Sequence, residues 1–151
     1  MSRTHIPKAL RTLVAEDAAH RCGYCLSVEA VIGVPFEMDH LIPESLGGRT
    51  VRENLWLCCG PCNDRKGTRI SAIDAQTGQR VRVFHPRRDE WLQHFRWTAN
   101  GELIEGLTPI GRATVLALEL NRPLLVTARR AWVRVGWHPP AEARSVRRRP
   151  R

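Results

Sequence analysis

Residues 59–67 read Cys-Gly-Pro-Cys-Asn-Asp-Arg-Lys-Gly, and this stretch sets the architecture of the first half of the chain. It begins with a Cys-x-x-Cys pair, and Pro61 is suited to the first turn of a short helix that Gly67 ends. A second Cys-x-x-Cys pair lies upstream, within residues 22–25. Two such pairs are typical of a structural zinc site built from four thiolates. The expected zinc ligands are Cys22, Cys25, Cys59 and Cys62.

Two short strands are expected between the cysteine pairs. Residues 34–41 and 54–58 have the composition of strands, and the glycine-containing residues 44–53 read as the loop that joins them. A helix should precede the first pair, because apolar residues recur at helical spacing from Pro7 to about His20. The predicted order is therefore helix, strand, loop, strand, helix.

The run Phe36-Glu37-Met38-Asp39-His40 between the pairs offers groups for chemistry. His40 is the candidate general base, because an imidazole titrates near neutral pH. Asp39 and Asn63 are candidate oxygen ligands for a catalytic Mg²⁺ or Mn²⁺ ion. Adjacent residues of a regular strand point to opposite faces. Asp39 and His40 can therefore act on one substrate phosphate only if the strand ends or twists there. We therefore expect the backbone at residues 39–40 to depart from a flat ladder.

Further residues are expected to support this chemistry. Lys66 lies one helical turn after Asn63 and, with Arg65, is expected to bind a substrate phosphate. Asn54 is placed to form hydrogen bonds across the loop and to hold its shape. Glu37 shares a strand face with Asp39 and is a weaker candidate for a further metal ligand, since such a residue is more often solvated.

Together these motifs resemble the HNH endonuclease family, and most closely its zinc-stapled branch. The matching motifs are Cys-x-x-Cys, Asp-His-x-x-Pro, Gly-Gly, Glu-Asn-Leu and Cys-x-x-Cys-Asn-x-x-Lys-Gly, all within residues 6–67. The resemblance implies an α+β protein with a small ββα-metal core that hydrolyses DNA phosphodiester bonds with a divalent cation. It implies that His40 activates water, Asn54 steadies the loop, and Asp39 and Asn63 hold the cation. Asn63 stands where the family's namesake residue is His, and an amide oxygen favours a hard cation.

Composition agrees with a nucleic-acid partner and a reducing compartment. The chain has 24 Lys+Arg against 15 Asp+Glu, a net charge of +9, which favours an anionic partner such as DNA. Its five cysteines are an odd number that fits a disulfide framework poorly, and the N-terminus lacks the apolar segment of a signal peptide. No run approaches the ~20 apolar residues that cross a bilayer. We expect a soluble, cytoplasmic protein in which Cys58 is a spare buried thiol.

The chain is expected to have three parts: a nuclease core at residues 1–70, an extension at 71–140, and a basic disordered tail at 141–151. In the extension, Asn100-Gly101 is a hairpin turn signal, and Pro109 and Pro123 are suited to open two helices. The extension contains no motif that assigns it a role, and nothing in the sequence marks an oligomeric state.

Two other functions compete with the nuclease. A non-catalytic zinc-binding module that binds nucleic acid would use the same four cysteines, and it would hold DNA without cutting it. Cys59-Gly60-Pro61-Cys62 is also the dithiol pattern of thioredoxin-like oxidoreductases. The redox function is disfavoured because Cys58 replaces the Trp usual before that motif and because a second cysteine pair lies upstream.

Overall fold

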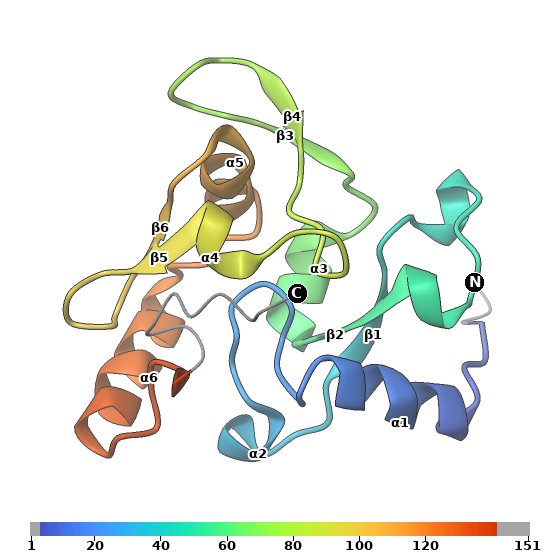
Figure 1. Ribbon diagram of the computed structural model, residues 1–151, viewed down its shortest axis with the longest axis horizontal. Coiled ribbons are helices and arrows are strands. Elements are labelled where there is room, and N and C mark those ends of the chain that lie inside the picture. Colours follow the sequence, from blue (N-terminus) through green and yellow to red (C-terminus); the bar gives the residue numbers. More distant parts are fainter. Residues whose placement is uncertain (1–3, 142–151) are drawn as a thin grey trace, which may run out of the picture. The chain divides into compact units, whose positions relative to one another are not determined.

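The computed structural model describes residues 4–141 and divides the chain into two compact units (Figure 1). Unit 1 comprises the described residues up to Ser71 together with His85–Arg88. Unit 2 comprises Ala72–Phe84 and the described residues from Asp89 onward. From residue 142 on, the expected basic tail lies outside the described residues.

Unit 1 is built around a two-stranded antiparallel sheet. Strands β1 (Glu37–His40) and β2 (Leu55–Cys58) pair, with α1 (Lys8–Asp17) against β2 and α3 (Gly60–Lys66) against β1 (Figure 1). The side chains of Leu55 and Leu57 are buried on this sheet, as the apolar character of the second strand requires. The order strand, strand, helix confirms the predicted α+β class and agrees with a ββα-metal core.

The strand ends at His40, as expected, but residues 39–40 do not depart from the ladder before that end. Asp39 lies opposite Trp56 and His40 opposite Leu55, in register with the rest of β1. The next residue, Leu41, still donates its backbone N–H to the Asn54 carbonyl at 2.9 Å. Asp39 and His40 therefore point to different sides of the strand, as regular pleating requires.

The connections within unit 1 contain short helical turns. α2 (Glu29–Ile32) follows the first cysteine pair, and two 3₁₀ turns, η1 (Glu44–Leu46) and η2 (Arg52–Asn54), occur in the segment between the strands. Gly48 has a steric role there, because a Cβ atom at this position would lie 1.7 Å from the Ile42 carbonyl oxygen. Only glycine lets the two backbones approach this closely.

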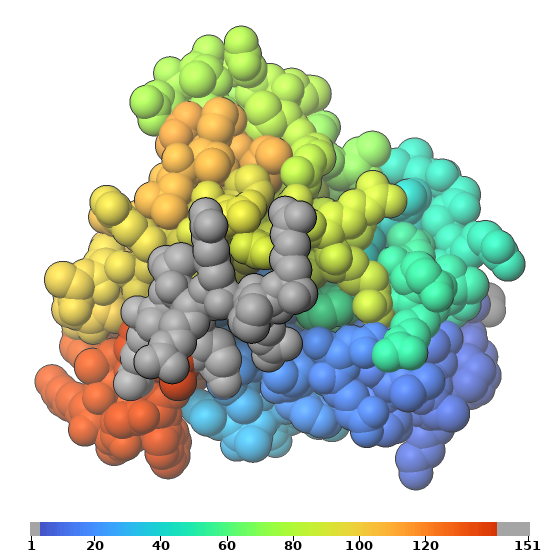
Figure 2. All heavy atoms as spheres, in the orientation of Figure 1, coloured from blue at the N-terminus to red at the C-terminus, as the bar shows by residue number. Residues whose placement is uncertain are grey.

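Residues 85–88 belong to unit 1, and Arg87 contacts its helix α1 and its strand β2. Its Nε donates to the Leu55 carbonyl at 3.0 Å, and a terminal nitrogen donates to Asp17 Oδ2 at 3.0 Å. Its guanidinium lies 4.8 Å from the centre of the Trp56 ring. Arg52 also binds Asp17, and hydrogen bonds from these two arginines lower the pKa of Asp17 to about 2. In the space-filling view, α1 and the segment that carries Arg52 meet at the surface (Figure 2).

Unit 2 contains two small sheets and three helices. β3 (Ser71–Ile73), which begins at the last residue of the main segment of unit 1, pairs with β4 (Arg80–Arg82). β5 (Phe95–Trp97) pairs with β6 (Ile104–Gly106). The helices are α4 (Trp91–His94), α5 (Pro109–Ala117) and α6 (Pro123–Arg134). The predicted hairpin and the two proline-initiated helices are thereby confirmed.

Two arginines of unit 2 bind buried polar groups of that unit. Arg129 of α6 is fully buried, and its guanidinium donates to the carbonyls of Leu120 and Glu102 at 2.8 and 3.1 Å. Arg112 of α5 binds both carboxylate oxygens of buried Asp74 at 2.9 Å, which holds the pKa of that carboxyl well below its usual range.

Among residues 4–141, no helix is both long and apolar enough to cross a membrane.

Candidate active site and metal centre

Four cysteines of unit 1 form a cluster suited to one metal ion. The sulfur atoms of Cys22, Cys25, Cys59 and Cys62 all lie within 4.8 Å of one another, and all four residues are buried. The Sγ atoms of Cys25 and Cys59 are 3.7 Å apart. A tetrahedral zinc site with Zn–S bonds of about 2.3 Å places its sulfurs about 3.8 Å apart. The cluster therefore fits zinc, as the cysteine spacing predicted.

Because the four cysteines are buried, negative charge on their sulfurs must be balanced by a cation. Desolvation raises the pKa of Cys22 well above its usual value, so a proton or a metal ion must balance charge there. Cys58 is the fifth cysteine; it is fully buried at the end of β2, and burial raises its pKa to about 11. It therefore remains a neutral thiol, in line with its predicted role as a spare buried residue.

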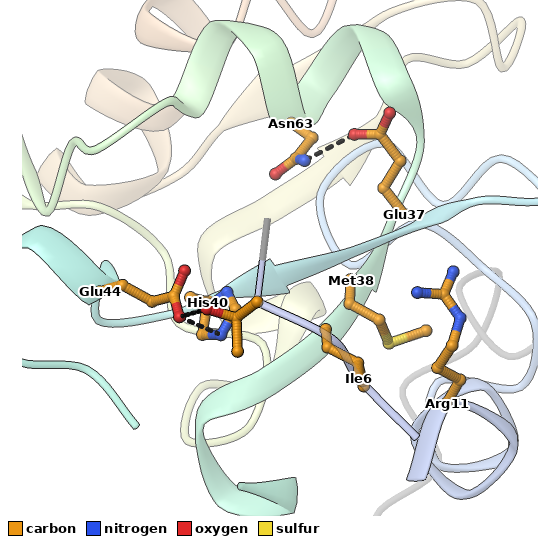
Figure 3. A pocket seen from close by; sticks show the side chains of 8 residues that line it. Ile6, Arg11, Glu37, Met38, His40, Glu44 and Asn63 are labelled. Atoms are coloured by element: carbon orange, nitrogen blue, oxygen red, sulfur yellow. Dashed lines mark hydrogen bonds and ion pairs between the residues drawn. The ribbon is translucent and has the colours of Figure 1, made fainter. Parts of the chain in front are cut away.

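A pocket of about 280 Å³ lies beside β1 in unit 1 (Figure 3). Strand β1 and helix α3 contribute part of its lining, and the segment that enters α1 contributes the rest. The lining residues are Thr4, Ile6, Arg11, Glu37, Met38, His40, Glu44 and Asn63. Two of the predicted catalytic residues, His40 and Asn63, therefore lie in one pocket.

The imidazole of His40 is held by polar neighbours and remains partly accessible. Its Nε2 lies 2.9 Å from Thr50 Oγ1 and 3.9 Å from Glu44 Oε1. Glu44 also accepts a hydrogen bond from the Thr4 hydroxyl. The His40 side chain is 16% exposed, so it is not enclosed by apolar residues.

The carboxylate that lies beside Asn63 is Glu37. The Asn63 amide nitrogen donates to Glu37 Oε2 at 2.6 Å. The two side chains point toward each other in Figure 3. With its nitrogen engaged, Asn63 presents its amide oxygen as the remaining acceptor. A carboxylate and an amide oxygen are the hard ligands that Mg²⁺ and Mn²⁺ prefer.

Asp39 is located elsewhere than the sequence analysis expected. It is 3% exposed and does not line the described pocket. Its Oδ1 accepts from Lys66 Nζ at 3.0 Å and its Oδ2 from the Tyr24 hydroxyl at 2.7 Å. Burial raises the pKa of Asp39, while Lys66 and Tyr24 act in the opposite direction. To bind a cation in the pocket, Asp39 would have to exchange these buried partners.

Lys66 is likewise buried, although it was expected to bind a substrate phosphate. Its side chain is 1% exposed, and besides Asp39 its ammonium binds the His40 carbonyl at 3.1 Å. A lysine is buried in this way only with a charge partner, and Asp39 supplies one. Arg65 does not line the described pocket, and its guanidinium donates to the Pro61 carbonyl at 3.2 Å.

Asn54 binds both sides of the segment between the strands. Its Oδ1 accepts from the Ile42 N–H at 2.8 Å, and its Nδ2 donates to the Ile42 and Arg49 carbonyls at 3.0 and 2.9 Å. These contacts close the loop that carries Glu44 and Thr50, the two neighbours of the His40 ring. Asn54 thus acts at a distance from the reacting groups.

Sequence reasoning missed several side chains that line the pocket or contact the predicted site residues. Thr50 and Glu44 lie in a segment read as a plain loop, and Tyr24 lies inside the first cysteine knuckle. Arg11 belongs to a helix that was assigned no function. Glu37 was a weaker candidate for a metal ligand than Asp39. Its two-residue spacing from Asp39, which places both on one strand face, pointed to it.

Comparison with known proteins agrees with this geometry. No curated protein and no solved structure matches the chain. Residues 22–69, which span both cysteine pairs, the two strands and α3, match the family model described as HNH endonuclease. The match indicates a nuclease or nucleic-acid-related function. Residues 22–69 are therefore similar to the HNH endonuclease family, and the four-cysteine cluster is consistent with the zinc-stapled branch of that family.

Proposed function

We propose that the protein is a metal-dependent endonuclease that hydrolyses DNA phosphodiester bonds in the pocket beside β1. The observation that carries the proposal is the presence of His40, Glu37 and Asn63 in one accessible pocket of an HNH domain. An imidazole base and two hard oxygen ligands are the groups that phosphodiester hydrolysis requires.

In this proposal His40 is the general base. When Nε2–H donates to Thr50 Oγ1, Nδ1 keeps its lone pair and can accept a proton from water. The oxygen of that water forms a bond to phosphorus, the bond from phosphorus to a deoxyribose oxygen breaks, and the leaving oxygen gains a proton from solvent. Thr50 and Glu44 act as positioning residues, since they hold the ring without contacting the phosphate.

Glu37 and Asn63 are the proposed ligands of the catalytic cation, Mg²⁺ or Mn²⁺. When bound, such a cation stabilises negative charge on the phosphate and on the leaving oxygen. Asp39, the ligand that the family resemblance implies, is proposed instead as a buried brace that joins β1 to α3 through Lys66. The four-cysteine cluster is proposed to hold structural zinc and to take no part in hydrolysis.

A second candidate function has one observation in its favour. Asp39 and Lys66 bind each other in the interior, so an expected cation ligand and an expected phosphate-binding residue are both engaged in this arrangement. A zinc-binding module that binds DNA without cutting it needs neither of them. The basic charge of the chain serves both functions equally.

Incubation of the purified protein with supercoiled plasmid separates the two functions. With Mg²⁺ or Mn²⁺ we expect nicked or linear product. With EDTA we expect intact plasmid, provided that the incubation is short enough for the protein to keep its zinc. A retarded but uncut plasmid with each cation would contradict the nuclease and support the binding module.

A further inference from the structure

We infer that Arg11 is a phosphate-binding residue of the catalytic pocket. This inference rests on the proposed function, and it assigns a substrate contact to a residue outside the matched HNH segment, residues 22–69. Arg11 takes over the role that the sequence analysis gave to Lys66, which the structure buries against Asp39.

The location of Arg11 supports the inference. Arg11 is exposed on α1 and lines the pocket together with Met38 and Glu37. Figure 3 shows its side chain extending from α1 towards the opening beside β1, with the guanidinium near the Met38 side chain. A phosphate that reaches His40 thus enters a pocket whose wall carries this cation.

Arg11 also has unused binding capacity. Arg52 and Arg87, two other arginines near α1, both bind the carboxylate of Asp17. In contrast, no group among residues 4–141 forms a hydrogen bond or ion pair with the Arg11 guanidinium. A guanidinium presents five N–H donors in a planar fork that matches two oxygens of a phosphate.

The charge of the lining makes Arg11 important. The carboxylates of Glu37 and Glu44 outweigh the single guanidinium, which leaves one net negative charge when His40 is neutral. A bound divalent cation converts this to one net positive charge, and the pocket then attracts a phosphate. Without Arg11 the same pocket with its cation would be neutral, so Arg11 decides whether the loaded site favours an anion.

The test compares wild type with Arg11→Ala, Arg11→Lys and Lys8→Ala. Lys8 is a matched control, because it is an exposed cation on the same helix and does not line the pocket. Arg11→Ala should fold normally, since alanine favours helices as well as arginine does and no described contact is lost. Thermal unfolding of each variant checks this.

Two readouts are measured. For Mg²⁺-dependent cleavage of a short duplex, Arg11→Ala should raise KM roughly five- to tenfold, because one charged phosphate contact is lost. For equilibrium binding of that duplex with Mg²⁺, each protein carries His40→Ala so that the DNA stays intact. There the slope of log affinity against log salt concentration should fall by about 0.9 for Arg11→Ala. Arg11→Lys should keep the wild-type slope, and Lys8→Ala should keep the wild-type KM.

The outcomes separate this inference from the proposed function. If Arg11→Ala matches wild type in KM and in salt slope, or if Lys8→Ala loses as much as Arg11→Ala, the assignment of Arg11 is overturned. If the wild-type protein cuts no DNA, hydrolysis is refuted. In that case the salt slopes alone decide whether Arg11 binds a phosphate.

Discussion

Replacing His40 with alanine should lower the rate of plasmid cleavage by roughly 10²- to 10⁴-fold, the contribution typical of a general base. The variant should stay folded, because it loses only the contacts of a partly exposed ring with Thr50 and Glu44. Those contacts are worth on the order of 1 kcal/mol. The measurement is the initial cleavage rate at saturating Mg²⁺, with circular dichroism as the check on folding.

His20→Ala is the matched control for this prediction. His20 is also a histidine of unit 1 with a carboxylate neighbour, Glu29, at 3.1 Å, but it does not line the pocket. Its replacement should leave the cleavage rate within twofold of wild type, on the order of the scatter expected for a surface substitution. A His40→Ala protein that cuts as fast as His20→Ala would remove His40 as the base.

Loss of zinc from the four-cysteine cluster should unfold unit 1. Structural zinc contributes about 10–16 kcal/mol of apparent binding free energy in zinc-finger peptides, whereas whole domains are stable by only about 5–15 kcal/mol. The cluster joins the knuckle at residues 22–25 to the start of α3. Without it, the strand pair and α3 would have only a small apolar core to hold them together.

Cys22→Ser tests the zinc prediction, and Cys58→Ser is its control. Both changes replace a buried thiol by a hydroxyl, and the two sulfurs lie only 4.0 Å apart. We expect one zinc ion per chain in wild type and Cys58→Ser, and none in Cys22→Ser, by elemental analysis. Hydrogen exchange should show loss of protection in residues 22–69 for Cys22→Ser alone. A metal-free Cys22→Ser protein with wild-type protection would contradict a structural role for zinc.

Local signals made much of unit 1 predictable. The spacing of the cysteines predicted the cluster, because two Cys-x-x-Cys pairs in one short segment usually form a metal site. Pro61 and Gly67 marked the ends of α3 to within one residue. The hairpin around Asn100-Gly101 was predictable for the same reason: Gly101 has a φ of +75°, a conformation that favours glycine. Each of these features depends on residues close together in the chain.

The features that escaped prediction depend on contacts between distant residues. Glu37 and Asp39 share a strand face, so the sequence could not tell which of them meets the pocket and which meets Lys66. The burial of Lys66 follows from the rotation of α3 on β1, which no local pattern reports. Arg87 contacts Leu55 although it lies outside residues 1–70, the expected core. Arg129 is buried with its guanidinium bound to the backbone carbonyls of two separate segments, at Glu102 and Leu120.

Residues 39 and 40 are an example of a site that depends on contacts with distant residues. Asp39 and His40 were expected to meet at one phosphate where the strand ends or twists. The strand is regular, and His40 reaches the pocket with Glu37 and Asn63 instead. Glu37 shares a strand face with Asp39 and not with His40, yet Glu37 and His40 both line the pocket. Alternation along β1 therefore does not by itself decide which side chains line one pocket.

The most direct test of this arrangement is a Mg²⁺ titration of cleavage by Glu37→Gln and Asp39→Asn. Glu37→Gln keeps an acceptor for Asn63 and should fold as wild type does, but it should need more than about tenfold more Mg²⁺ for half-maximal rate. Asp39→Asn leaves buried Lys66 without a charge partner and should be less stable by about 3–5 kcal/mol. Its Mg²⁺ requirement, measured where it is still folded, should equal that of wild type. A Glu37→Gln enzyme with a wild-type Mg²⁺ titration, beside a folded Asp39→Asn enzyme that no longer responds to Mg²⁺, would contradict the account.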